Sequence, residues 1–202
     1  MFKFILTSAL SLTIFSTASA EDLGFRYHQD PHTLKGVCKD SNGTIGFNPD
    51  FIGQCGMLDG RVFIQTDIPH DSLGLNNLDL SGASLRNTTL KELNLRGVKF
   101  SGANFSGAKL SDSDLSYTLF FTTNFVGTEL RRTKFSGAYF SNNDLSNADF
   151  LEADLKGSVF REVTIINTKF SGALFDCLST LPFNKEEAIA RGMVFIEQNC
   201  VE

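Results

Sequence analysis

The histidines are the first candidates for metal binding or proton transfer, and there are three of them: His28, His32 and His70. His28 and His32 stand four residues apart in the segment 28–32, a spacing that would place both on one face of a helix. Pro31 opposes a helix at this point, and the sequence offers no third strong ligand nearby. A polar N-terminal segment is therefore favoured over a metal site or an enzymatic role for this region.

A second candidate is an oxygen-rich calcium loop, because Asp40, Asn42 and Thr44 alternate as such ligands do. Ile45 stands where that loop requires Gly, and Phe51 where it requires Glu, so the segment is interpreted as a turn. Elsewhere no nucleophile, base and orienting acid cluster, and no Gly-rich loop leads from a strand into a helix. The sequence predicts no catalytic residues, no cofactor and no metal ion.

The first residues have the order of a secretory signal peptide. Lys3 supplies the positive charge, 4–15 is mostly apolar, and Ala18-Ser19-Ala20 is a small-residue cleavage site. The apolar stretch is shorter than the roughly 20 residues of a membrane span, so no span is expected. The prediction is a signal peptide over residues 1–20, cleavage after Ala20, and a periplasmic or secreted protein.

A period of five dominates the sequence from residue 76 to residue 175. Every fifth residue is large and apolar, a period that neither a helix nor a plain strand produces and that is typical of a solenoid. The series is Leu80, Leu85, Leu90, Leu95, Phe100, Phe105, Leu110, Leu115, Phe120, Phe125, Leu130, Phe135, Phe140, Leu145, Phe150, Leu155, Phe160, Ile165, Phe170 and Phe175.

The positions around each large residue are also patterned. Two residues before it stands a small side chain, as at Ala103 and Thr128, so both positions are expected to point inward. Two residues after it stands Gly or Asn in most repeats, as at Gly82 and Asn142, which predicts a bend once per repeat.

Stretches such as 103–107 (ANFSG) and 148–152 (ADFLE) resemble the A-(D/N)-L-x-x unit of the pentapeptide-repeat family. The resemblance covers about half of the chain. It implies an all-β solenoid, namely a right-handed, four-sided (quadrilateral) β-helix with four repeats per coil. Residues that lie twenty apart would then stack, with Leu80, Phe100, Phe120, Phe140 and Phe160 in one inner column.

The ends of a solenoid expose strand edges and core, so both ends are expected to be covered. Four segments are predicted: the signal peptide 1–20, an irregular N-terminal cap 21–70, the repeat β-helix 71–175 and a C-terminal cap 176–202. The last contains a short helix that begins with Asn184 and Glu187 as a capping box and ends near Gly192. Ile189 and Met193 are expected to face the last coil.

The cysteines number four, an even count that in an exported chain favours two disulfides. Cys38 and Cys55 precede the repeats, whereas Cys177 and Cys200 follow them. A bridge needs Cα atoms within about 7 Å, which a rod of five coils forbids between its ends. The expected pairs are Cys38–Cys55 and Cys177–Cys200. Free thiols and a zinc site are the alternatives, and zinc is disfavoured because no C-x₂-C pair is present.

One outward column is unusual for its apolar content. Residues just before the large ones, at a spacing of twenty, include Leu119, Tyr139 and Val159, and Phe121 lies beside them. Such a patch is a candidate interaction surface for an unknown protein partner or for self-association. The alternatives are scattered surface apolarity, or a patch that is covered by a terminal segment.

Charge bears on the competing functions. After cleavage the chain would carry 17 basic and 23 acidic residues, a net charge of −6 that indicates no nucleic-acid partner. The family resemblance also suggests a DNA-mimicking topoisomerase-protection protein. That role needs a cytoplasmic location, which the leader opposes, and a dense acidic surface, whereas residues 76–175 hold 10 acidic and 11 basic residues. An ice-binding ladder would need unbroken Thr or Ser, which Phe121 and Arg161 interrupt. A non-catalytic binding or scaffold module of the cell envelope is favoured.

Overall fold

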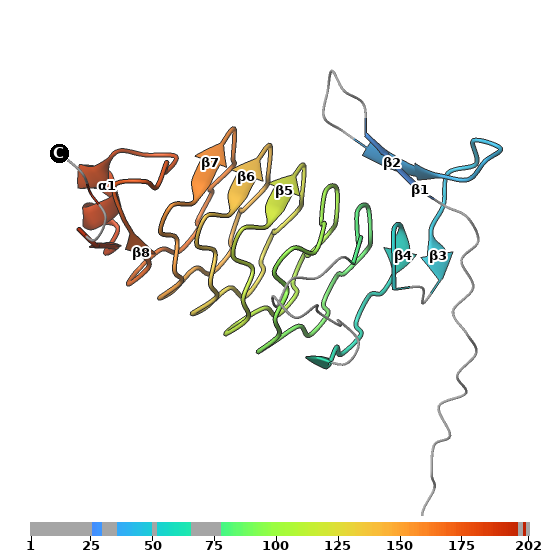
Figure 1. Cartoon of the computed structure of the whole chain (residues 1–202), viewed down its shortest axis with the longest axis horizontal. Coiled ribbons are helices and arrows are strands. Elements are labelled where there is room, and N and C mark those ends of the chain that lie inside the picture. The colour runs from blue at the N-terminus through green and yellow to red at the C-terminus, as the bar shows by residue number, and fades with distance from the viewer. Residues whose placement is uncertain (1–25, 30–35, 50–51, 66–77, 198–199, 201–202) are drawn as a thin grey trace, which may run out of the picture.

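The computed structural model describes residues 26–29, 36–49, 52–65, 78–197 and 200 (Figure 1). The proposed signal peptide and its cleavage site at Ala20 lie outside these residues, as do His32 and His70.

The repeats form a right-handed β-helix solenoid in which successive coils stack along one axis (Figure 1). Residues twenty apart pair in parallel, so each coil contains four five-residue repeats. Backbone hydrogen bonds run in both directions between neighbouring coils. Leu90 N–H donates to Lys109 O (2.7 Å), and Lys109 N–H donates to Thr88 O (2.8 Å). One of the resulting ladders runs through Ser84, Asn104, Asn124, Asp144 and Thr164.

Most of these ladders consist of single bridges, but one side of the coil forms a three-stranded parallel sheet. Its strands are β5 (Leu119–Phe121), β6 (Tyr139–Ser141) and β7 (Val159–Arg161). Phe120, Phe140 and Phe160 stand opposite one another at the centre of these strands and point into the core.

The large five-spaced residues form one continuous core, as the period predicts. From Leu80 to Phe175 all of them are buried except Ile165, which is partly exposed. The inner column is a stack of rings: Phe120 and Phe140 have centroids 4.9 Å apart, and Phe140 and Phe160 4.5 Å apart. Each buried Phe or Leu removes enough apolar surface from water to contribute about 2 kcal/mol before chain entropy is counted.

The small positions point inward too, and several of their hydroxyl groups donate to carbonyl groups of the preceding coil. Thr123 Oγ1 donates to Phe100 O and Thr128 Oγ1 to Phe105 O, both at 2.9 Å. Because a buried hydroxyl without a partner costs free energy, these bonds let Thr replace Ala at an inward position.

The predicted bends lie at positive φ. Gly82 has φ 69° and Asn142 φ 55°, the left-handed region that Gly and Asn tolerate best. Other residues also occupy this region at the bends, Thr122 (φ 52°) and Tyr117 (φ 59°) among them. The stacked coils therefore impose the bend even on side chains that do not favour it.

The N-terminal part contains an antiparallel hairpin of β1 (Arg26–Gln29) and β2 (Gly36–Lys39), followed by β3 (Asn48–Pro49) and β4 (Gly56–Met57). Segment 56–63 is already part of the solenoid. Met57 pairs in parallel with Ser84 and Val62 with Thr89, while Leu58 and Phe63 join the core cluster. The segment assigned to the cap from its lack of period thus contributes core residues.

The C-terminal part adds β8 (Leu174–Phe175), α1 (Lys185–Ala190) and β9 (Val194–Phe195), with β9 paired in parallel to β8. Asn184 Oδ1 accepts a hydrogen bond from Glu187 N–H (2.9 Å), so the helix begins as expected. Met193 is buried, but the prediction for Ile189 is wrong, because its side chain is 52% exposed. Ala188 packs against the core in its place, since the helix turns this smaller residue toward the coil.

Each end carries one disulfide. Cys38 is bonded to Cys55 with Cα atoms 5.7 Å apart, and Cys177 to Cys200 with Cα atoms 5.5 Å apart. Disulfides persist in oxidising compartments, so two of them are typical of an extracellular or periplasmic protein.

Candidate interaction surface

The outward side chains of β5, β6 and β7 form an apolar column. Leu119 stands opposite Tyr139, and Tyr139 opposite Val159, in parallel register. Leu119 is 53% exposed, whereas Tyr139 and Val159 are half-buried by their neighbours. Adjacent strands lie about 4.8 Å apart, so three side chains that are far apart in the sequence become one continuous stripe.

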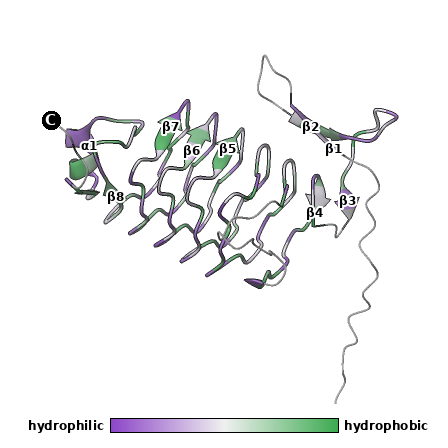
Figure 2. Ribbon diagram, viewed as in Figure 1, coloured by the Kyte–Doolittle hydropathy of each residue, from purple (hydrophilic) through white to green (hydrophobic). Residues whose placement is uncertain are grey.

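Phe121 adds an aromatic ring to this stripe. Its side chain points outward from the end of β5. The centroid of its ring lies 5.6 Å from the ring centroid of Tyr139 on the next strand. Leu119, Phe121, Tyr139 and Val159 are called the apolar face below. The hydropathy colouring of Figure 2 shows β5 as hydrophobic along its length, in contrast to several of the hydrophilic bends.

The N-terminal hairpin borders the apolar face on one side. The ring of Tyr27, from β1, lies over the bends at Gly82 and Gly102, and its hydroxyl is 3.3 Å from Thr122 Oγ1. Thr122 directly follows Phe121, so the hairpin reaches the edge of the apolar face. Leu119 nevertheless remains exposed, so the hairpin leaves this part of the face open.

A groove that the sequence reasoning missed borders the other side. Tyr117 and Leu178, 63% and 62% exposed, stand at its ends, and Gly137 and Gly157 form part of its lining. Its volume is about 390 Å³. The signal available in the sequence was Tyr117 itself, an aromatic residue in a bend column that otherwise holds Gly97, Gly137, Gly157 and Cys177.

Charged groups lie at the ends of the stripe. Lys99, one coil before Leu119, pairs with Asp79 at 3.9 Å, and Arg161 is exposed on β7. Burial of Asp79 raises the pKa of its carboxyl, but hydrogen bonds from Gln54 and Ser81 and the charge of Lys99 outweigh this effect. The pKa of Asp79 is therefore lowered, and it is an anion at neutral pH.

The repeat units match the family model for pentapeptide repeats, in 8 copies over residues 79–116, 123–161 and 144–176. Residues of these segments pair at a spacing of twenty. This chain is a pentapeptide-repeat protein. The recognition made from residues 103–107 and 148–152 is thereby confirmed.

Solved structures of other pentapeptide-repeat proteins overlap this one. A protein of the Arabidopsis thaliana thylakoid lumen is 20% identical over 63% of this chain and 79% of that chain, with a TM-score of 0.41. QnrB1, a plasmid-mediated fluoroquinolone resistance protein, is 16% identical over 69% of this chain and 90% of that chain (TM-score 0.34). A protein from Nostoc Pcc 7120 is 26% identical over 58% and 84% (TM-score 0.34). No curated protein sequence matched.

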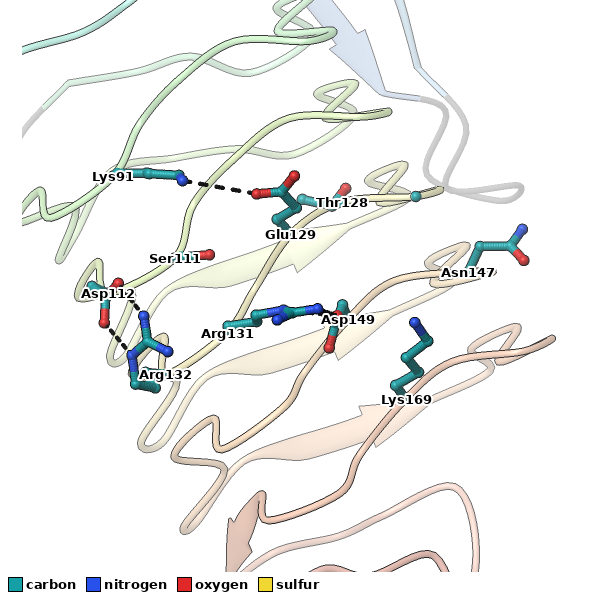
Figure 3. Close-up of a pocket in the computed structure, with 11 residues that line it drawn as sticks. Lys91, Ser111, Asp112, Thr128, Glu129, Arg131, Arg132, Asn147, Asp149 and Lys169 are labelled. Carbon is teal, nitrogen blue, oxygen red and sulfur yellow. Dashed lines mark hydrogen bonds and ion pairs between the residues drawn. The ribbon is translucent and has the colours of Figure 1, made fainter.

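Half a coil away from the apolar face, this pentapeptide-repeat protein presents a charged surface, called the charged face below (Figure 3). Arg131 and Asp149 form an ion pair at 2.7 Å, and Lys91 and Glu129 approach to 3.9 Å. The residues around this hollow are Lys91, Ser111, Asp112, Gly127, Thr128, Glu129, Arg131, Arg132, Asn147, Asp149 and Lys169. Cations and anions alternate here, so the charges largely satisfy one another.

The best-defined pair on the charged face is Asp112 with Arg132. Arg132 Nε donates to Asp112 Oδ1 at 2.6 Å and Nη2 to Oδ2 at 2.8 Å, a bidentate arrangement. These hydrogen bonds, together with the positive charges of Arg132 and Lys91, lower the pKa of Asp112. Asp112 is therefore a paired anion rather than a free acid or base.

The other chemical candidates of the sequence are placed as follows. His28 lies in β1 opposite Val37, while the other two histidines are not described. Asp40 Oδ1 accepts hydrogen bonds from the N–H groups of Asn42 and Thr44, so this segment is a turn. Within the described residues, no three His, Cys, Asp or Glu side chains gather as metal ligands would.

None of the helices in the described part of the chain is long and apolar enough to cross a membrane.

Proposed function

We propose that this chain is a non-catalytic binding module of the cell envelope that contacts a protein partner through its apolar face. The observation that carries the proposal is the register of β5, β6 and β7, which gathers Leu119, Tyr139 and Val159 into one stripe. Phe121 and Tyr139 together form an aromatic pair of the kind that anchors protein interfaces.

The proposal includes export and the shape of the rod. The leader with cleavage after Ala20 would deliver the chain to the periplasm or outside, and the two disulfides support an oxidising destination. Four repeats per coil support a four-sided cross-section. Segment 21–70, which contains the hairpin, would cap one end of the rod, and segment 176–202, which contains α1, would cap the other.

The apolar face exposes a small area, which favours a protein partner that inserts a few side chains. A second copy of this chain is less favoured. Four side chains expose only a few hundred Å² at most, whereas a stable dimer buries about 800 Å² on each subunit. Two copies joined by the apolar face alone would therefore associate weakly.

Topoisomerase protection by DNA mimicry is not supported by the charges. A DNA mimic needs a dense acidic surface, whereas Arg131 and Arg132 neutralise Asp149 and Asp112 on the charged face. The balance of acidic and basic side chains also argues against a nucleic-acid partner.

The test compares the intact protein with a Phe121→Ser, Tyr139→Ser double variant in affinity capture from envelope extract. Capture of the partner should fall about tenfold or more, because truncating an interface anchor costs about 2 kcal/mol or more. The thermal unfolding midpoint should change little, since both side chains point outward.

The matched control is Lys109→Ser with Lys169→Ser, two outward positions half a coil away. This control should capture the partner as well as the intact protein does. Equal capture by the intact protein and the apolar double variant would overturn the proposal.

A further inference from the structure

We infer that the groove beside the apolar face is a socket for an aromatic side chain of the protein partner. The ring would lie on the backbone of Gly157, between Tyr117 and Leu178. That the ring belongs to a protein partner rests on the proposed function. The socket itself is inferred from the geometry of the bends.

The molecule already shows how a ring fits on a pair of glycine bends. Tyr27 lies over Gly82 and Gly102, which stack one coil apart. A Cβ added at Gly82 would stand 2.6 Å from Tyr27 Cδ2, and one added at Gly102 would also collide with the ring. Two consecutive glycines in a bend column therefore make a flat place for one tyrosine ring, which any larger residue would block.

Gly137 and Gly157 form the corresponding pair next to the apolar face. The ring of Tyr117 lies close to Gly137, where an added Cβ would stand 2.7 Å from Tyr117 Cδ1. Over Gly157, the only described atoms within 4 Å of an added Cβ belong to the Gly137 backbone, at 3.7 and 3.9 Å. Half of this two-glycine site is thus covered by the protein's own ring, and the other half is open.

Tyr117 forms the aromatic wall of the groove from a bend whose positive φ the stacked coils impose. Its φ of 59° costs an L-residue roughly 1–2 kcal/mol relative to ordinary conformations, and it is the one aromatic residue among the described residues at positive φ. The ring is exposed, with the Arg96 guanidinium carbon 5.3 Å from its centroid. The ring lies outside the core and presents one of its faces to the groove.

The lining of the groove favours an aromatic ring over a sugar. Asp176 Oδ1 already accepts hydrogen bonds from Gly157 N–H (2.9 Å) and Leu178 N–H (3.1 Å), and the ammonium group of Lys156 lies 3.3 Å from Asp154. A sugar is bound by several convergent polar groups, and the carboxylate of Asp176 and the ammonium group of Lys156 are already engaged with the protein. An aromatic ring needs only the apolar walls that Tyr117 and Leu178 provide.

Gly127 supplies the matched comparison. It is also an open bend, with φ 66° and no described atom within 4 Å of an added Cβ. Its hollow is lined by polar and charged residues without an aromatic wall. In the same column, Asn147 and Asn167 adopt positive φ, so Asn is compatible with this backbone.

The experiment titrates the full, disulfide-bonded protein with p-cresol, the side chain of tyrosine, and follows backbone amide NMR signals. The signals of Gly137 and Gly157 should shift and saturate. Gly157→Asn and Tyr117→Asn should each weaken this binding about fivefold, as expected for an aromatic contact, while Gly127→Asn should leave it within a factor of about two.

Methyl β-glucopyranoside serves as the sugar probe under the same conditions. Shifts at Gly137 and Gly157 with the sugar but not with p-cresol would overturn the inference, as would the absence of saturable shifts with p-cresol. Binding of p-cresol that is insensitive to both Tyr117→Asn and Gly157→Asn would overturn it too. None of these outcomes depends on partner capture. The inference about the socket can therefore be overturned while the apolar face still captures the partner, and loss of capture would leave p-cresol binding untouched.

Discussion

The apolar face and the charged face share the same coils and both stand on large, apolar inward residues, yet their surfaces have opposite characters. Behind the apolar face the inward column is Phe100, Phe120, Phe140 and Phe160, and behind the charged face it contains Leu90, Leu110 and Leu130 before Phe150 and Phe170. Outward, one face places Leu119 beside Tyr139 and Val159, and the other places Lys109 beside Glu129 and Asp149.

The difference shows that the solenoid constrains inward and outward positions unequally. A large inward residue must fill a fixed volume between two coils, so only apolar side chains of a suitable size fit there. An outward residue meets mainly water and the residues twenty before and after it, so Leu119 and Lys109 fit the same backbone. The outward columns are therefore where this protein can differ from other proteins of the same fold.

The largest effect is expected from the ring stack behind the apolar face. Phe140→Ala removes a ring that contacts Phe120 and Phe160 at centroid distances of 4.9 and 4.5 Å, and it should lower the free energy of unfolding by about 3–5 kcal/mol. Urea unfolding followed by circular dichroism measures the change.

Leu130→Ala, behind the charged face, is the matched substitution, and it should cost about 2–5 kcal/mol. Two variants that both unfold at the same urea concentration as the intact protein would show that these residues are not in a common core. A somewhat larger loss is expected for Phe140→Ala, because it removes the larger side chain and leaves the larger cavity.

A smaller effect is expected at the hairpin that borders the apolar face. Replacing Cys38 and Cys55 together by Ser opens a loop with a sequence separation of 17 and should cost about 3 kcal/mol in the chain-entropy estimate. Because Cys38 and Tyr27 both pack at Gly82, the amide of Gly102 should also exchange hydrogen faster. Thermal unfolding and hydrogen exchange test both expectations.

The second disulfide is the control for this local effect. Replacing Cys177 and Cys200 by Ser removes a bridge of similar span, 23 residues, at the opposite end. It should destabilise the protein comparably but leave the exchange of the Gly102 amide unchanged. Equal acceleration at Gly102 in both variants would mean that the hairpin does not depend on its own disulfide.

The smallest effect is expected on the charged face. Arg132→Gln removes the bidentate hydrogen bonds that lower the pKa of Asp112, so this pKa should rise toward the ordinary range of Asp. A lowered pKa in the folded state adds stability above the unfolded-state pKa, and this stability is lost as the pH falls through the folded-state pKa. NMR titration of the Asp112 carboxyl carbon measures the shift.

The matched Arg131→Gln variant removes a neighbouring cation that pairs with Asp149 instead. It should leave the pKa of Asp112 closer to its value in the intact protein than Arg132→Gln does. An Asp112 titration that is unchanged in Arg132→Gln would contradict the paired description of the charged face.

The sequence by itself determined the solenoid and its core. A five-residue period that recurs from Leu80 to Phe175 leaves one consistent set of inward residues, since each coil repeats the same local geometry and core volume. The bends at Gly82 and Asn142 were predictable for the same reason, because few residues accept positive φ readily. The Asn184 cap depended on local chemistry and could also be predicted.

Only the tertiary structure decided which outward residues meet. Leu58 and Phe63 join the core although the sequence around them breaks the period, because later coils supply their partners. Ile189 turns outward because the docking of α1 selects Ala188. The placement of Tyr27 on Gly82 and Gly102, and the groove between Tyr117 and Leu178, arise from contacts between segments far apart in the chain, and such contacts leave no period in the sequence.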